Sequence, residues 1–105
     1  MGQQTFPFQP AASAVNTSNI VVTTANQTFT LSPSVGSDGG SMRLANIGTQ
    51  TIFVALGTVT ASASTSMPIM ANTIEMFSLP GGVNTLSVIA AATGSTLYAT
   101  IGIGL

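Results

Sequence analysis

The C-terminal stretch Thr96-Leu97-Tyr98-Ala99-Thr100-Ile101 alternates hydroxyl-bearing and apolar side chains without a break. Successive side chains of a β-strand point to opposite faces, so this alternation predicts a strand with one face in a hydrophobic core. Thr93-Gly94, directly before it, is typical of a turn. No stretch of ten or more residues has the 3.6-residue period of a helix. We therefore expect strands, and no helix, along the rest of the chain.

Short runs with the same alternation recur towards the N-terminus, separated by Gly, Pro, Asn and Ser. They predict strands at 19–24, 28–31, 41–47, 51–56, 67–70, 73–79, 86–90 and 96–101. The short connections within the first two pairs, 19–24 with 28–31 and 41–47 with 51–56, predict two hairpins. Pro68 marks its strand as an edge strand, since proline is tolerated there. Residues 57–66 are expected to form a loop or a weak edge strand.

Seven or eight short strands with regular turns predict an all-β fold, an antiparallel β-sandwich that is jelly-roll-like by strand count. The 105 residues suffice for one domain, which we place at 19–105. Residues 1–18 are expected to form an extended N-terminal arm, because Pro7 and Pro10 favour extended backbone around Phe6 and Phe8. The two phenylalanines either fold back onto their own domain or dock on a neighbouring subunit.

Only three residues are charged, Asp38, Arg43 and Glu75, and histidine and cysteine are absent. Catalytic His systems, thiolate metal sites and disulfides are therefore excluded, and one Arg cannot neutralise several phosphates of a nucleic acid. Asp38 lies among glycines and serines as an ordinary turn residue. We expect no enzyme activity, no cofactor and no metal, and Glu75 is expected to pair with Arg43 or to face solvent.

The low charge and a mean hydropathy of +0.56 predict association, because net charge near zero promotes it. No apolar run is long enough for a membrane helix, and no signal peptide is recognised at the start of the sequence. The expected partner is the chain itself, in a homodimer or homotrimer. The candidate interface residues are Phe6, Phe8, Arg43, Glu75 and Tyr98, and the clustered methionines 67, 70 and 76 are expected to fill gaps in a core or a subunit contact.

Several segments together resemble a group of small virion proteins of tailed bacteriophages, some of which are taken to be capsid decoration or cement proteins. The segments are Met1-Gly2-Gln3-Gln4-Thr5-Phe6, Arg43-Leu44-Ala45-Asn46-Ile47-Gly48, Ile52-Phe53-Val54-Ala55-Leu56-Gly57, Met67-Pro68-Ile69, Thr73-Ile74-Glu75-Met76-Phe77 and Thr96-Leu97-Tyr98-Ala99-Thr100.

This resemblance implies a β-sandwich module that forms small oligomers on the outer capsid surface and contacts the major capsid protein, after synthesis in the bacterial cytoplasm. Such proteins tend to have Gly where Asn72 stands, and Asn also tolerates left-handed backbone. An alternative from another class is a tail or host-recognition module that binds carbohydrate, with Tyr98 stacking on a sugar.

Overall fold

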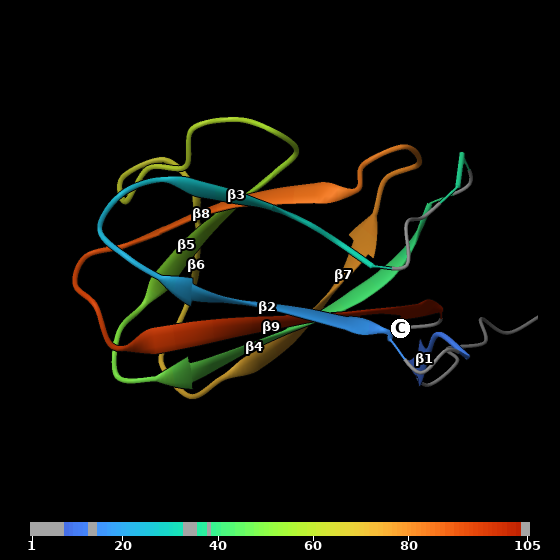
Figure 1. Ribbon diagram of the computed structural model, residues 1–105, viewed down its shortest axis with the longest axis horizontal. Coiled ribbons are helices and arrows are strands. Elements are labelled where there is room, and N and C mark those ends of the chain that lie inside the picture. Colours follow the sequence, from blue (N-terminus) through green and yellow to red (C-terminus); the bar gives the residue numbers. More distant parts are fainter. Residues whose placement is uncertain (1–7, 13–14, 33–35, 38, 104–105) are drawn as a thin grey trace, which may run out of the picture.

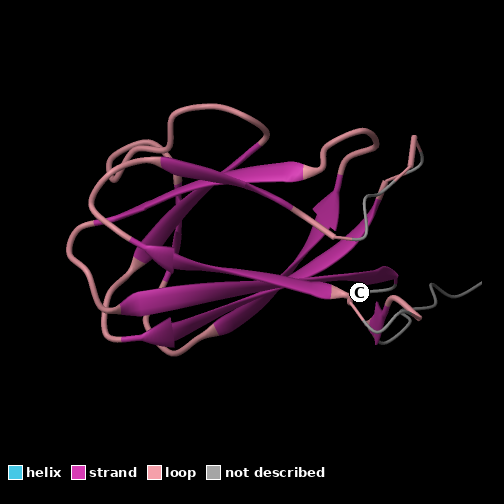
Figure 2. Cartoon of the chain, in the orientation of Figure 1, coloured by secondary structure: helices cyan, strands magenta, loops and turns pink. Residues whose placement is uncertain are grey.

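The computed structural model describes residues 8–12, 15–32, 36–37 and 39–103. Within these residues every regular element is a β-strand, and Figure 2 shows only strands and loops. The strands are β1 (Gln9–Pro10), β2 (Thr17–Val22), β3 (Gln27–Thr30), β4 (Gly40–Gly48), β5 (Ile52–Leu56), β6 (Met67–Ile69), β7 (Ile74–Leu79), β8 (Thr85–Ala90) and β9 (Ser95–Ile103).

The strands form two antiparallel sheets packed face to face (Figure 1), which confirms the predicted β-sandwich. Sheet A has the order β2-β9-β4-β7. β1 and β2 pair with the same edge of β9: β2 pairs with residues 95–100 and β1 with residues 102–103. Sheet B has the order β3-β8-β5-β6. Eight strands divided in these two orders have the connectivity of a jelly roll.

Both predicted hairpins are wrong, because the strands of each pair lie in different sheets. β2 pairs with β9 whereas β3 pairs with β8, and β4 pairs with β7 and β9 whereas β5 pairs with β6 and β8. The connection 49–51 is bound at a corner of the sandwich: Ser95 Oγ accepts a hydrogen bond from the Gln50 amide at 2.9 Å and donates to the Gln50 carbonyl at 2.8 Å. These bonds turn the chain towards the other sheet rather than back along β4.

The remaining sequence predictions for the strands agree with the structure. β6, which contains Pro68, pairs only with β5 and is an edge of sheet B. Residues 57–66 form a loop without strand structure. Asn72 has a φ of 57°, the left-handed conformation expected for a position where glycine is also suitable.

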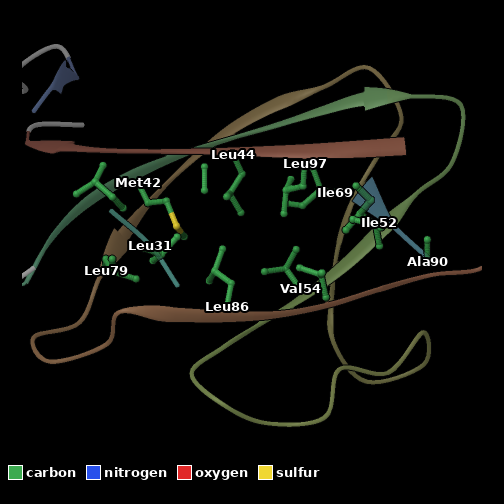
Figure 3. Close-up of a cluster of buried hydrophobic side chains, with 14 residues drawn as sticks. Leu31, Met42, Leu44, Ile52, Val54, Ile69, Leu79, Leu86, Ala90 and Leu97 are labelled. Carbon is green, nitrogen blue, oxygen red and sulfur yellow. The ribbon is translucent and has the colours of Figure 1, made fainter. Parts of the chain in front are cut away.

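The core fills the space between the sheets. Figure 3 shows Leu44 and Leu97 of sheet A pointing towards Val54 and Leu86 of sheet B. In β9 the apolar side chains at 97, 99 and 101 are all buried, as the alternation predicts. Fourteen buried apolar residues form this cluster: Val22, Leu31, Met42, Leu44, Ile52, Val54, Ile69, Leu79, Leu86, Val88, Ala90, Leu97, Ala99 and Ile101.

Candidate interaction surface

The outer face of sheet B is partly covered by the chain's own loop 57–66, which arches over β3 and β8 in Figure 1. Ser87 of β8 points into this contact: its Oγ donates to the Gly57 carbonyl at 2.9 Å and accepts from the Val59 amide at 3.0 Å. Asn26 holds the same loop, because its Oδ1 accepts a hydrogen bond from the Ala61 amide at 2.8 Å. Ala61 is buried as a result, with 2% of its surface exposed.

The outer face of sheet A carries a set of exposed apolar side chains instead. Side chains directly opposite one another in paired strands share a face, and so do alternate residues of one strand. This rule places five of the ten large hydrophobic residues that are exposed on this single face, and we call it the open face. Its exposed apolar residues are Val21 of β2, Ile47 of β4, Ile74 and Met76 of β7, and Tyr98 of β9.

The strand register determines which large and small side chains are neighbours on the open face. Ala45 lies between Tyr98 on one side and Ile74 on the other, so a small residue separates two large ones. Ile47 stands beside Thr96, which in turn stands beside Val21. Ala45 is only 8% exposed, so Tyr98, Ile74 and their neighbours form the contact surface above it.

The open face extends across all four main strands of sheet A. Four strands spaced about 4.8 Å apart and about six residues in length cover roughly 300–400 Å² in projection. The five exposed apolar residues share this area with Arg43, Thr96 and Thr100. Together with the low charge, this extent makes the open face the strongest candidate interaction surface among the described residues.

Arg43 contributes the one charged side chain found on the open face. It is half-buried, lies between Thr100 of β9 and Met76 of β7, and is diagonal to Tyr98. Its guanidinium forms no ion pair with any residue that the structure describes, and Glu75, the one described carboxylate side chain, is on the opposite face. A partner that supplies an acceptor would therefore pair with a cation that the described residues leave without a carboxylate.

Glu75 is on the other side of the same sheet. It lies directly opposite Leu44, whose side chain is completely buried in the core, so Glu75 points towards the inner face. β7 is an edge strand and Glu75 is half-buried, which places its carboxylate at the open side of the sandwich. The intrachain pair between Arg43 and Glu75 is not formed, because adjacent register positions point to opposite faces.

Phe8 lies against its own chain. The Phe8 ring and the Gln9 carbonyl pass so close to Gly102 of β9 that a Cβ at this glycine would come within 2.8 Å of the ring and 2.0 Å of the carbonyl oxygen. β1 is thereby held on sheet A, and the Ala11 amide donates to the Ile101 carbonyl at 2.8 Å. Phe6 and Asp38 lie outside the described residues.

The three clustered methionines are all exposed, by 38% at Met67, 56% at Met70 and 46% at Met76. Filling of the chain's own core is therefore not their role. Met76 belongs to the open face, whereas Met67 is the first residue of β6 and Met70 lies in the 70–73 connection from β6 to β7. We call Met67, Met70 and Glu75 the β6–β7 rim.

The described residues contain no arrangement that suggests chemistry. They include no group of three or more residues that could hold a metal ion. The buried hydroxyl groups of Ser87 and Ser95 are engaged with backbone groups of loops and corners. Within the same residues the structure has no helix of the length and hydropathy needed to cross a membrane.

The open face includes three residues that the sequence did not single out: Val21, Ile47 and Ile74. A signal was present for Ile74, because Ile74 and Met76 alternate with Glu75 and Phe77 and both sets contain large apolar side chains. A strand with two apolar faces indicates cover on both sides. The positions of Val21 and Ile47 beside Tyr98 depend on the strand order.

Comparisons with known proteins add information on the fold. No protein-family model matches the sequence, and no match was found among curated proteins. A solved structure described as the crystal structure of PirA is similar, with a TM-score of 0.54, 10% sequence identity, and coverage of 87% of this chain and 97% of that chain. At this identity the similarity concerns the sandwich architecture alone.

Proposed function

We propose that this chain is a non-enzymatic structural protein of a tailed-bacteriophage virion, a capsid decoration or cement protein that bridges major capsid protein subunits on the outer capsid surface. The observation that carries the proposal is the open face, a charge-poor surface with five exposed apolar side chains, which among the described residues is covered by its own chain only at the Gly102 end, where Phe8 and Gln9 lie. A surface of this kind favours burial against protein. The sequence resemblance to phage virion proteins supplies the class of assembly.

A cement protein acts through binding equilibria rather than chemistry. A molecule that binds the assembled shell and not the free capsid subunits shifts the equilibrium towards the shell. Many copies on one lattice multiply a modest contact through avidity. A rigid jelly roll with fixed apolar side chains suits this task, because little conformational freedom is lost on binding.

The proposal is tested with empty expanded capsids of the phage that encodes the chain, prepared without it. We expect the chain to co-sediment with these shells and to raise their melting temperature. The variant I74S/M76S should bind at least tenfold more weakly, because it removes two exposed apolar side chains without disturbing the core. V59S is the matched control, since Val59 is 49% exposed on the loop that covers sheet B.

Failure to co-sediment at saturating concentration would refute the cement function. Binding to host polysaccharide on a glycan array at millimolar or lower concentration, abolished by replacement of Tyr98 with Ser, would instead support the carbohydrate-binding alternative. That alternative rests on Tyr98, which is 40% exposed on the open face. Because one aromatic side chain is a small platform for a sugar, we favour the cement function.

A further inference from the structure

We infer that the open face is occupied by a second copy of this chain, which inserts its β6–β7 rim so that its Glu75 meets Arg43. The contact is head-to-tail, and repeated contacts of this type close a ring of three or more copies. In the assembled ring the open face is covered by a neighbouring copy, and it serves the proposed function by holding together the copies that bind a capsid with avidity. The inference itself concerns the association of the chain with itself and does not depend on the presence of a capsid.

Charge complementarity within the chain is the first argument. Arg43 is the chain's one cationic side chain, and Glu75 is the one carboxylate side chain among the described residues. They lie in neighbouring strands of sheet A but on opposite faces, so they cannot meet within one molecule. A head-to-tail contact between two copies brings Arg43 of one to Glu75 of the other, and in a closed ring every Arg43 and every Glu75 then has a partner of opposite sign.

The position of Arg43 on the open face argues against a face-to-face dimer. Arg43 is on the central strand β4, one row of side chains from Ala45 near the middle of the face. A two-fold axis through the middle of the open face would bring two guanidinium groups near each other in a water-poor interface without a carboxylate between them. Like charges in such a setting repel, so the symmetric arrangement is disfavoured.

The shapes and chemistry of the two surfaces match. The β6–β7 rim presents Met67 and Met70, two exposed and flexible side chains that adapt to irregular surfaces. The open face offers the exposed side chains of Tyr98 and Ile74, one on each side of the buried Ala45. A thioether beside an aromatic ring is a favourable contact, and the Arg43–Glu75 pair would fix the register of the two copies.

The area of the contact favours ring closure. The open face limits the contact to about 400 Å² on its side, so the total is at most about 800 Å², below the roughly 1,200–2,000 Å² of a standard stable interface. One such contact would give a weak dimer. In a closed ring each copy makes two contacts, and the last contact forms within a single assembly, at high effective concentration.

The inference is tested by charge reversal in solution, without capsids. Light scattering after size exclusion should give the wild-type chain a mass of at least three times 10.5 kDa. R43E alone and E75R alone should each raise the concentration at which half of the copies assemble by at least tenfold. The double variant R43E/E75R should restore assembly, because it re-forms the pair with the charges exchanged.

Controls separate loss of the contact from loss of the fold. T30E and T93R add charge at exposed positions away from both surfaces and should leave the mass unchanged. Far-ultraviolet circular dichroism should show strand structure in every variant. If a charge-reversed variant does not fold, the milder R43M or E75Q takes its place. If both R43E and E75R fold, a mixture of the two should give mixed complexes in native mass spectrometry, because each variant then supplies the charge that the other lacks.

Three results would overturn the inference: a monomeric or dimeric wild-type chain, single reversals that assemble as well as the wild type, or a folded double variant that stays dissociated. A ring that forms normally but does not bind capsids would refute the proposed function and leave this inference intact. A chain that binds capsids as a monomer would refute this inference and leave the proposed function intact.

Discussion

At the scale of single residues, Asn46 connects the two sheets. Its side chain is completely buried, and its Nδ2 donates to the Ile69 carbonyl of β6 at 2.9 Å and to the Gln50 carbonyl at 2.8 Å. Asn46 Oδ1 is buried without a hydrogen-bond partner. One amide therefore satisfies two backbone acceptors at the corner, and its own unpaired oxygen reduces the net gain in stability.

The variant N46A should lower the free energy of unfolding by about 2–3 kcal/mol, since it removes two hydrogen bonds and opens a small cavity between the sheets. Urea unfolding followed by circular dichroism measures this change. T93A, at an exposed turn, is the matched control and should stay within about 0.5 kcal/mol of the wild type. Equal midpoints for the two variants would mean that Asn46 does not hold the sheets together.

The role of Asn46 also shows the limit of local sequence patterns. Within Asn46-Ile47-Gly48-Thr49 the sequence predicts a hairpin turn, because Asn and Gly are common in turns. The partner that keeps Asn46 in the core, the Ile69 carbonyl, is 23 residues away in the sequence. A local pattern says nothing of a partner at that separation, so the sequence predicted a hairpin beside Asn46 and not a bridge from Asn46 to the other sheet.

At the scale of elements, the loop 57–66 distinguishes the two outer faces. Its attachment to sheet B depends on Ser87, a buried residue whose Oγ bonds to the loop at Gly57 and Val59 and to the Thr28 hydroxyl at 2.8 Å. The loop thereby covers one sheet, and the open face is left on the other. The difference in cover between the two outer faces thus depends on a few hydroxyl and amide groups that hold the loop 57–66.

The variant S87A should detach this loop. We expect the Val59 amide to lose hydrogen-exchange protection and the free energy of unfolding to fall by about 1–3 kcal/mol, because buried backbone groups lose their partner. S78A is the control, since Ser78 is exposed on β7 and should change neither quantity by much. A protected Val59 amide in S87A would show that apolar contacts alone hold the loop.

The sequence predicted the strands well and their pairing poorly, for a physical reason. Alternation of apolar and polar side chains is local, and it located β9, the Pro68 edge strand and the loop 57–66. Which strands become neighbours depends on burial of whole faces across the chain. Tyr98 and Arg43 were therefore recognised as interface candidates, but their common face with Val21, Ile47 and Ile74 required the strand order.

At the scale of the whole molecule, the surface is as poor in charge as the core, because only three of the 105 residues are charged. The open face has one cation, and the exposed positions elsewhere carry mainly hydroxyl, amide and apolar side chains. Contacts between such surfaces depend on removal of apolar groups from water and on neutral hydrogen bonds. Screening by salt acts on charges and leaves these contributions largely in place.

Assembly of this chain should therefore resist salt. Between about 0.05 and 1 M NaCl the Debye length falls from roughly 14 to 3 Å, which removes most attraction between exposed charges. We expect the sedimentation coefficient of the assembled chain to stay constant over this range, and sodium sulfate to strengthen assembly because excluded salts favour burial of apolar surface. The double variant R43E/E75R should respond in the same way as the wild type, since a buried pair is screened little. Dissociation at 1 M NaCl would show that exposed charges hold the copies together, and the open face would then lose its place as the main source of binding energy.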